Sequence, residues 1–246
     1  MKILKNSLII LLFTIFGCNS DQSNFDAMTE EENSSINQTN SISAYSLEEI
    51  LNGIRKWDSL RSNPDELLQY FESYNAFKID MALFPQGNAL HAYACIINGE
   101  LKYAVISEVY DQEIYQDSLI KYIKIVDLHY TDIAVLTEQT YENYTFPLPT
   151  QYIQAADAID RIEEWNTNYA AWLSSGSTVY QSFYIPTYSL QAQKYSVYFG
   201  LKNNLENASV KDADLVLDSN AGSFYDTVLL QPPFINNSKN YILDLL

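Results

Sequence analysis

Two side chains with reactive chemistry, His91 and Cys95, lie in the stretch LHAYACI at residues 90–96. A histidine base within hydrogen-bond reach of a cysteine thiol is a common nucleophilic centre in hydrolases. The stretch alternates like a β-strand, however, and four residues along a strand span about 13 Å. Lys102 lies across the predicted hairpin from Cys95 and would activate an exposed thiol. We interpret Cys95 as a small, partly buried thiol and predict no catalytic pair here.

The remaining residues that could bind a metal or a cofactor are sparse. His129 lies beside Asp127 in a strand pattern, and two histidines with one free thiol do not make a recognisable zinc spacing. The sequence contains no G-x-S-x-G motif, phosphate-binding loop, dinucleotide fingerprint or calcium loop. Carboxylate pairs such as Glu163 and Glu164 fall on a predicted helix surface, where they are solvated. We therefore predict neither a metal site nor a cofactor.

Tyrosine is unusually frequent, with 20 in 246 residues. Such rings pack half-buried against strands, but they also stack on sugars and anchor protein interfaces. Alternation from residue 179 to residue 185 places Phe183 and Ile185 toward the core and Tyr180 and Tyr184 on the opposite side. Tyr195 belongs to the same tyrosine-rich region. The predicted binding surface consists of Tyr180, Tyr184, Tyr188 and Tyr198.

The N-terminus has the pattern of an export signal. Lys2 and Lys5 precede an apolar stretch at residues 7–16, which is too short to span a membrane as a helix. The sequence Ile15-Phe16-Gly17-Cys18 resembles a bacterial lipobox, in which the cysteine is lipidated and becomes the new N-terminus. We therefore predict a signal peptide over residues 1–17 and a lipid anchor, such as palmitate, on Cys18.

The segment after Cys18 predicts a disordered tether over residues 18–44, because its Ser, Asn, Gln and Glu lack hydrophobic mass and periodicity. As a flexible coil it would average about 28 Å from end to end. Without Lys2 and Lys5 the chain has 12 basic and 31 acidic residues. This charge excludes nucleic acid as a favourable partner, because phosphate backbones are bound by clusters of lysine and arginine. The expected partner is the membrane, to which the lipid on Cys18 would anchor the protein.

The folded part is expected to contain two similar α+β units, at residues 45–149 and 150–246, each with a helix packed on an antiparallel sheet. Their sequences EEILNGIRKWDSL (48–60) and ADAIDRIEEWNTN (156–168) align with Trp57 on Trp165. Downstream, MALFPQ (81–86) parallels SFYIPT (182–187), and LHAYACI (90–96) parallels YSVYFGL (195–201).

Local signals define the elements of the first unit. Ser46 and Glu49 predict a capping box that opens a helix ending near Ser62, and Pro64 opens a second one. Strands are predicted over residues 77–83 and within residues 123–136. Asn98-Gly99 predicts a hairpin turn. The strands paired by this turn would face the core with Leu90, Ala92, Ala94, Ile96, Leu101, Tyr103 and Val105.

The order of a helix with Trp165, a strand ending at Ile185-Pro186, the run Tyr198-Phe199-Gly200 and the segment YDTVLLQPPF (225–234) resembles a family of small, uncharacterised lipoproteins of Bacteroidota. In that family cysteines flank the two prolines, whereas Gln231 and Phe234 stand there in this chain. The resemblance implies the fold and a location in the cell envelope, anchored in the outer membrane.

Three functions stay open from the sequence. The first is a non-catalytic, membrane-anchored envelope or surface lipoprotein that binds a macromolecule such as an envelope protein. The second is a glycan-binding accessory lipoprotein that uses exposed tyrosine and tryptophan rings. The third is a hydrolase with a carboxylate site that no sequence motif reveals.

Overall fold

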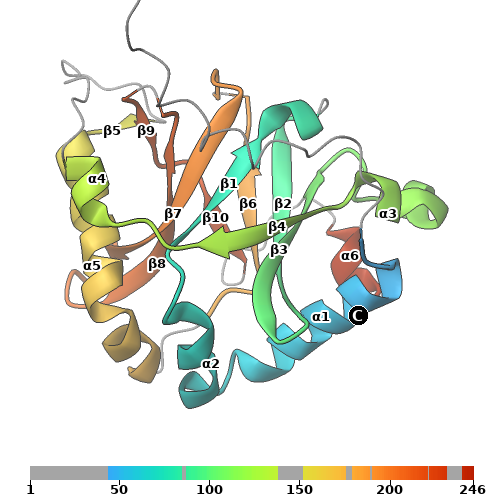
Figure 1. The fold of residues 1–246 in the computed structure, drawn as a ribbon, viewed down its shortest axis with the longest axis horizontal. Helices are drawn as coiled ribbons and strands as arrows, with labels where there is room; N and C mark the ends of the chain where they lie inside the picture. The colour runs from blue at the N-terminus through green and yellow to red at the C-terminus, as the bar shows by residue number, and fades with distance from the viewer. Residues whose placement is uncertain are drawn as a thin grey trace, which may run out of the picture. The chain divides into compact units, whose positions relative to one another are not determined.

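The structure is a computed structural model that describes residues 44–84, 87–137, 152–175, 179–188, 190–220, 222–231 and 240–246 (Figure 1). Residues 42–246 form one compact unit. The predicted signal peptide, Cys18 and nearly all of the predicted tether lie outside the described residues. None of the helices in the described part has the length and apolar character needed to span a bilayer.

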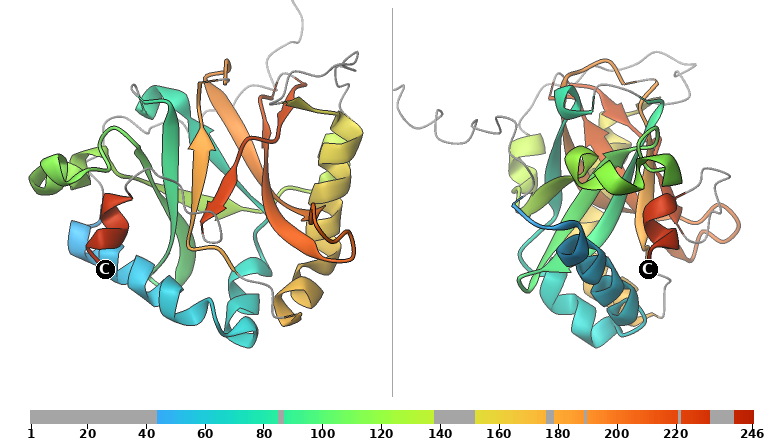
Figure 2. Two further views of the ribbon diagram at one scale, coloured as in Figure 1. Left: turned by 180° about the vertical axis from the view of Figure 1, so that it is seen from behind. Right: turned by 90° about the vertical axis from the view of Figure 1, so that its right-hand side faces the viewer.

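The fold is a mixed α+β arrangement, in which helices pack on one antiparallel sheet of ten strands. The strand order is β10-β6-β2-β3-β4-β1-β7-β8-β9-β5. Strands from both predicted units therefore join the same sheet (Figures 1 and 2). The strands are β1 (Ala76–Asp80), β2 (Ala89–Ile97), β3 (Glu100–Ser107), β4 (Lys124–His129), β5 (Tyr152–Ile153), β6 (Ser182–Pro186), β7 (Lys194–Asn203), β8 (Lys211–Asp218), β9 (Phe224–Tyr225) and β10 (Leu229–Gln231).

The first two helices begin at the signals that the sequence predicted. The side chain of Ser46 accepts a hydrogen bond from the Glu49 amide, and the Glu49 carboxylate accepts one from the Ser46 amide, which confirms the predicted capping box. Pro64 opens the second helix, where a missing amide hydrogen costs nothing. The helices are α1 (Leu47–Leu60), α2 (Pro64–Phe71), α3 (Leu119–Tyr122), α4 (Ile133–Thr137), α5 (Ala155–Ser174) and α6 (Tyr241–Asp244), with 3-10 helices η1 (Met81–Leu83) and η2 (Glu113–Ser118).

The inner face of the sheet holds the largest hydrophobic cluster. The predicted core face of the β2–β3 hairpin is confirmed, since all seven of its residues are buried in this cluster. Trp57 and Trp165 reach the same cluster from α1 and α5, and Phe71 of α2 contacts both rings edge to face. The hairpin turn at Asn98 and Gly99 has the predicted positive φ angles of 54° and 83°.

The outer face of the sheet is also covered, which the alternating pattern did not predict. On β2 the outward residues Tyr93 and Cys95 pack against Ile50 and Ile54 of α1 in a second cluster. Gly53 of α1 permits this close approach, because a Cβ there would lie 3.2 Å from the Cβ of Cys95 and 3.1 Å from the carbonyl oxygen of Ile96. All nine residues of β2 are therefore buried.

Two predicted strands are shorter than the sequence pattern indicated. β1 ends at Asp80, because the Asp80 side chain accepts from the Ala82 amide and starts η1. β4 ends at His129, and Asp132 accepts from the Ala134 amide at the start of α4. In both places a short aspartate side chain satisfies a free backbone amide and favours a helical turn over a continued strand.

Candidate functional site

Cys95 is not a reactive group in this structure. Its side chain is fully buried, its Sγ lies 3.4 Å from the carbonyl oxygen of Lys102, and burial raises its pKa to about 12. The Lys102 ammonium instead pairs with Glu100 at 2.9 Å and Asp127 at 2.5 Å. A neutral, inaccessible thiol is neither a nucleophile nor a metal ligand. The predicted absence of a His91–Cys95 pair thus has a second physical reason besides distance.

His91 has a different partner, Asp111, which the sequence analysis did not single out. The ring Nδ1 lies 2.5 Å from Oδ2 of Asp111, and both residues are almost fully buried. The hydroxyl of Tyr93, two positions along the same face of β2, donates to the same carboxylate oxygen. Burial and then the Asp111 charge raise the pKa of Tyr93, so that its hydroxyl remains a donor.

Two chain segments place Asp111 opposite β2. The backbone turns after Ser107, the last residue of β3, and the amides of Tyr110 and Asp111 donate to the Ser107 carbonyl oxygen at 2.9 and 3.2 Å. The second carboxylate oxygen of Asp111 accepts from the amide of Ile242 at 2.9 Å, at the C-terminal helix α6. Asp111 therefore joins β2, the turn after β3 and the C-terminus in one buried polar contact.

A pocket of about 960 Å³ lies beside this cluster, and His91 lines it. Because Asp111 occupies Nδ1, Nε2 is the nitrogen left for another partner. Nε2 is buried, and no described residue forms a hydrogen bond with it. Buried polar atoms are usually satisfied, so an unpartnered one beside a pocket indicates a place for a ligand group.

The pocket lining is acidic. It includes the carboxylates of Glu108, Glu113 and Asp244, together with Gln112, Tyr241, Val109 and Ile114. Glu108 accepts from the amide of Asn88 at 2.9 Å and from the hydroxyl of Tyr184 at 3.4 Å. Within the described ranges, none of the three lining carboxylates forms an ion pair with a lysine, arginine or histidine.

The predicted tyrosine surface is only partly exposed. Tyr180 and Tyr198 are buried, which corrects their assignment to a binding surface. Tyr180 precedes β6, so strand alternation does not apply to it, and its hydroxyl lies 3.0 Å from that of Tyr103 in the core. Tyr188 is 77% exposed. Tyr184 is half-buried, and its ring centroid lies 5.7 Å from that of His91.

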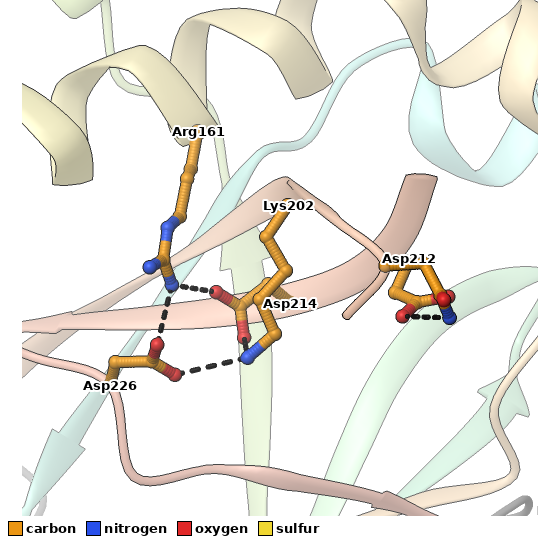
Figure 3. Close-up of polar contacts among 6 residues, drawn as sticks. Arg161, Lys202, Asp212, Asp214 and Asp226 are labelled. Carbon is orange, nitrogen blue, oxygen red and sulfur yellow. Dashed lines mark hydrogen bonds and ion pairs between the residues drawn. The ribbon is translucent and has the colours of Figure 1, made fainter. Parts of the chain in front are cut away.

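A second polar cluster connects α5 to the sheet (Figure 3). Arg161 contacts Asp214 and Asp226, each at 2.7 Å, and Lys202 contacts the same two carboxylates at 2.9 and 3.1 Å. Burial raises the pKa of Asp214, whereas for Asp226 burial is outweighed by Lys202 and Arg161, which lower its pKa. Two cations and two anions satisfy one another, so we interpret this cluster as structural.

The structure gives the other histidine no such environment. His129 is half-buried at the end of β4, and partial burial followed by the nearby charge of Lys78 lowers its pKa. In the part of the chain that the structure describes, no group of three or more histidine, cysteine, aspartate or glutamate side chains is placed to hold a metal ion.

Asp111 could not be recognised from the sequence, because it follows β3 in a turn and carries no motif. Comparison of the chain with protein-family models, curated proteins and solved structures gave no match. The His91 pocket is therefore the basis for a functional proposal.

Proposed function

We propose that this protein is a lipid-anchored envelope lipoprotein, of the kind it resembles in Bacteroidota, whose folded part binds a small ligand in the pocket beside His91. One observation carries the ligand-binding part of this proposal. His91 is buried, its ring is oriented by Asp111, and its Nε2 has no partner among the described residues although it belongs to a pocket-lining side chain. A ligand that bonds to Nε2 would complete the site.

Binding explains the pocket better than hydrolysis of an ester or amide does. Asp111 and His91 have the arrangement in which a carboxylate orients a histidine base. Such hydrolysis also needs hydrogen-bond donors or cations that stabilise an anionic intermediate. Among the described residues, the ionisable groups that line this pocket, besides His91 and the phenol of Tyr241, are the carboxylates of Glu108, Glu113 and Asp244, which would destabilise an anion.

The anchoring part of the proposal is supported by the residues before the tether. Gly17-Cys18 follows a short apolar stretch, and two or more acyl chains on a cysteine give a stable membrane anchor. Changing Cys18 to Ser should move the protein from the membrane fraction to the soluble fraction or block its maturation. Immunoblots of separated fractions measure this, with Cys95→Ser as the control. An unchanged membrane fraction for Cys18→Ser would contradict the anchor.

The two predicted units are part of the same proposal, as the products of an internal duplication. Strand register supports it. Ala76 of β1 pairs with Tyr198 of β7, and Ser182 of β6 pairs with Tyr93 of β2. Tyr93 and Tyr198 are aligned in the sequence comparison, so exchanging the two halves maps one pair onto the other. In this register Ser182 of β6 corresponds to Ala76 of β1. The sequence comparison had instead matched Ser182 with Met81, five residues further along the chain.

The helix–strand crossings support the duplication as well. In the first half Gly53 of α1 lies against Cys95 of β2, and in the second half Gly200 of β7 lies against Arg161 of α5. A Cβ on either glycine would meet the Cβ of its partner at 3.2 or 3.3 Å. In both halves a glycine therefore makes room where the helix crosses the strand. The glycine lies on the helix in the first half and on the strand in the second half. His91 itself aligns with Ser196, which contacts Asn220 at 3.0 Å, so the histidine of the pocket has no counterpart in the second half.

Histidine NMR can test the ligand pocket directly, because the chain has two histidines, His91 and His129. With ¹⁵N-labelled histidine, the variant His129→Gln assigns both side chains. A collection of cationic, neutral and anionic small molecules should contain members that shift the His91 signals and leave the His129 signals in place. Val109→Trp should abolish these shifts by filling the pocket.

The matched control is Val210→Trp, since Val210 is an exposed valine that does not line the pocket. It should leave the ligand-induced shifts unchanged. If no compound of any charge shifts the His91 signals, the pocket is not a ligand site and the proposal fails.

A further inference from the structure

We propose that the ligand of the His91 pocket is a small organic cation with N–H groups, such as an amine or a guanidinium compound. This inference rests on the proposed function, and it names the chemical class that the site would accept. Two independent features of the pocket carry it: the hydrogen-bonding role of His91 Nε2 and the charge of the lining.

The first feature is the direction of the missing hydrogen bond. A carboxylate accepts hydrogen bonds, so Nδ1 of His91 donates its proton to Asp111. In the neutral ring the other nitrogen, Nε2, then carries a lone pair and is an acceptor. The amide of Ile242 and the hydroxyl of Tyr93 hold Asp111 in place from two further directions. With the ring in this neutral form, a ligand that completes the site must donate a hydrogen bond to Nε2.

The second feature is the negative charge around this acceptor. Glu108, Glu113 and Asp244 line the pocket without a basic partner among the described residues. Partial burial raises the pKa of Tyr241, which also lines the pocket, and the charges of Glu113, Asp244 and Asp117 raise it further. A group that both donates a hydrogen bond and carries positive charge satisfies Nε2 and the carboxylates together.

An organic cation fits better than a metal ion. In the described ranges the carboxylates and His91 do not form a group of three placed to hold a metal. The pocket volume of about 960 Å³ suits an organic molecule, and Val109 and Ile114 offer apolar contacts for its methylene groups. Because three carboxylates are present, compounds with two or three positive charges should bind more tightly than compounds with one.

The experiment uses the full-length chain with its anchor, in a mild detergent, with labelled histidine. The probes are spermidine, 1,4-diaminobutane, butylamine, the neutral 1,4-butanediol, succinate and Zn²⁺, and a lysine-containing tripeptide tests whether the amine can belong to a peptide. We expect saturable shifts of His91 alone, with affinity falling in the order spermidine, diaminobutane, butylamine. The diol and succinate should give no shift.

The variant Glu113→Gln with Asp244→Asn removes two exposed lining charges without changing a buried residue. Two charge contacts of surface strength predict binding weaker by about 2- to 30-fold. The control, Asp160→Asn with Glu163→Gln, removes two exposed charges from α5 and should bind as the wild type does.

Each outcome has one meaning. If the diol or succinate binds as tightly as the amines, the proposal of a cationic ligand is wrong, although the pocket still binds ligands. Tighter binding of Zn²⁺ at His91 would have the same meaning. Amine affinity that falls equally in the lining variant and its control would also overturn the inference. If no probe shifts the His91 signals, both the cationic ligand and the ligand pocket are refuted.

Discussion

The Asp111 carboxylate should be one of the most destabilising positions to truncate in this protein. It accepts hydrogen bonds from His91, Tyr93 and the amide of Ile242, and all three donors belong to almost fully buried residues. The variant Asp111→Ala leaves these donors without an acceptor at about 1–3 kcal/mol each. Relief from burying the carboxylate offsets part of that sum. We expect a net loss of about 3–5 kcal/mol in the free energy of unfolding, from a typical total of about 5–15 kcal/mol.

Urea unfolding followed by tryptophan fluorescence measures this loss. The matched control is Asp218→Ala, because Asp218 is similarly buried and, among the described residues, accepts from one backbone amide, that of Asn220 at 2.9 Å. That variant should lose about 1 kcal/mol or less. Asp111→Asn keeps one acceptor oxygen and should fall between the two. Equal losses for Asp111→Ala and Asp218→Ala would refute the argument that the number of satisfied donors sets the cost.

Three further predictions concern other parts of the fold. Cys95 should resist alkylation at pH 8 in the folded protein and react fully in urea, because burial raises its pKa to about 12; rapid labelling of the folded chain would show that the strand opens. Trp57→Ala and Trp165→Ala should each cost about 3–5 kcal/mol in urea unfolding, as expected for large side chains that are almost fully buried, and a cost below 1 kcal/mol for either would place its ring outside the core. The pKa of His129 is lowered by partial burial and then by Lys78, so the unfolded chain takes up this proton at higher pH than the folded chain does. The stability of the wild type should therefore fall relative to His129→Gln as the pH decreases from 7 to 5. Parallel stability curves for the two proteins would contradict this.

Local chemistry made much of the fold predictable from the sequence. The Ser46–Glu49 capping box and the Asn98-Gly99 turn act over a few residues, and both appear as predicted. The alternation through β2 and β3 also gave the correct inner face. The outer face was not predictable in the same way, because α1 covers it through Gly53 and makes both faces of β2 buried.

The candidate site depended on contacts that no local pattern encodes. His91 was noticed as a chemical group, but its partner Asp111 lies beyond the end of β3, and α6 supplies a further contact from the C-terminus. Among the tyrosines, Tyr180 was misplaced because the strand begins at Ser182, three residues later than the alternation suggested. Burial of both sheet faces removes the contrast between inside and outside on which such patterns depend.

The pairing of β1 with β7 and of β6 with β2 has a consequence for how the chain folds during synthesis. The first half emerges from the ribosome with Ala76–Asp80 and Ala89–Ile97 but without the strands that pair with their free sides. Contacts of such long sequence separation slow folding, and exposed strand edges favour aggregation. The free sides of β1 and β2 therefore stay unpaired until residues 182–203 arrive. A chain that stops at residue 150 keeps two open sheet edges and cannot close its core.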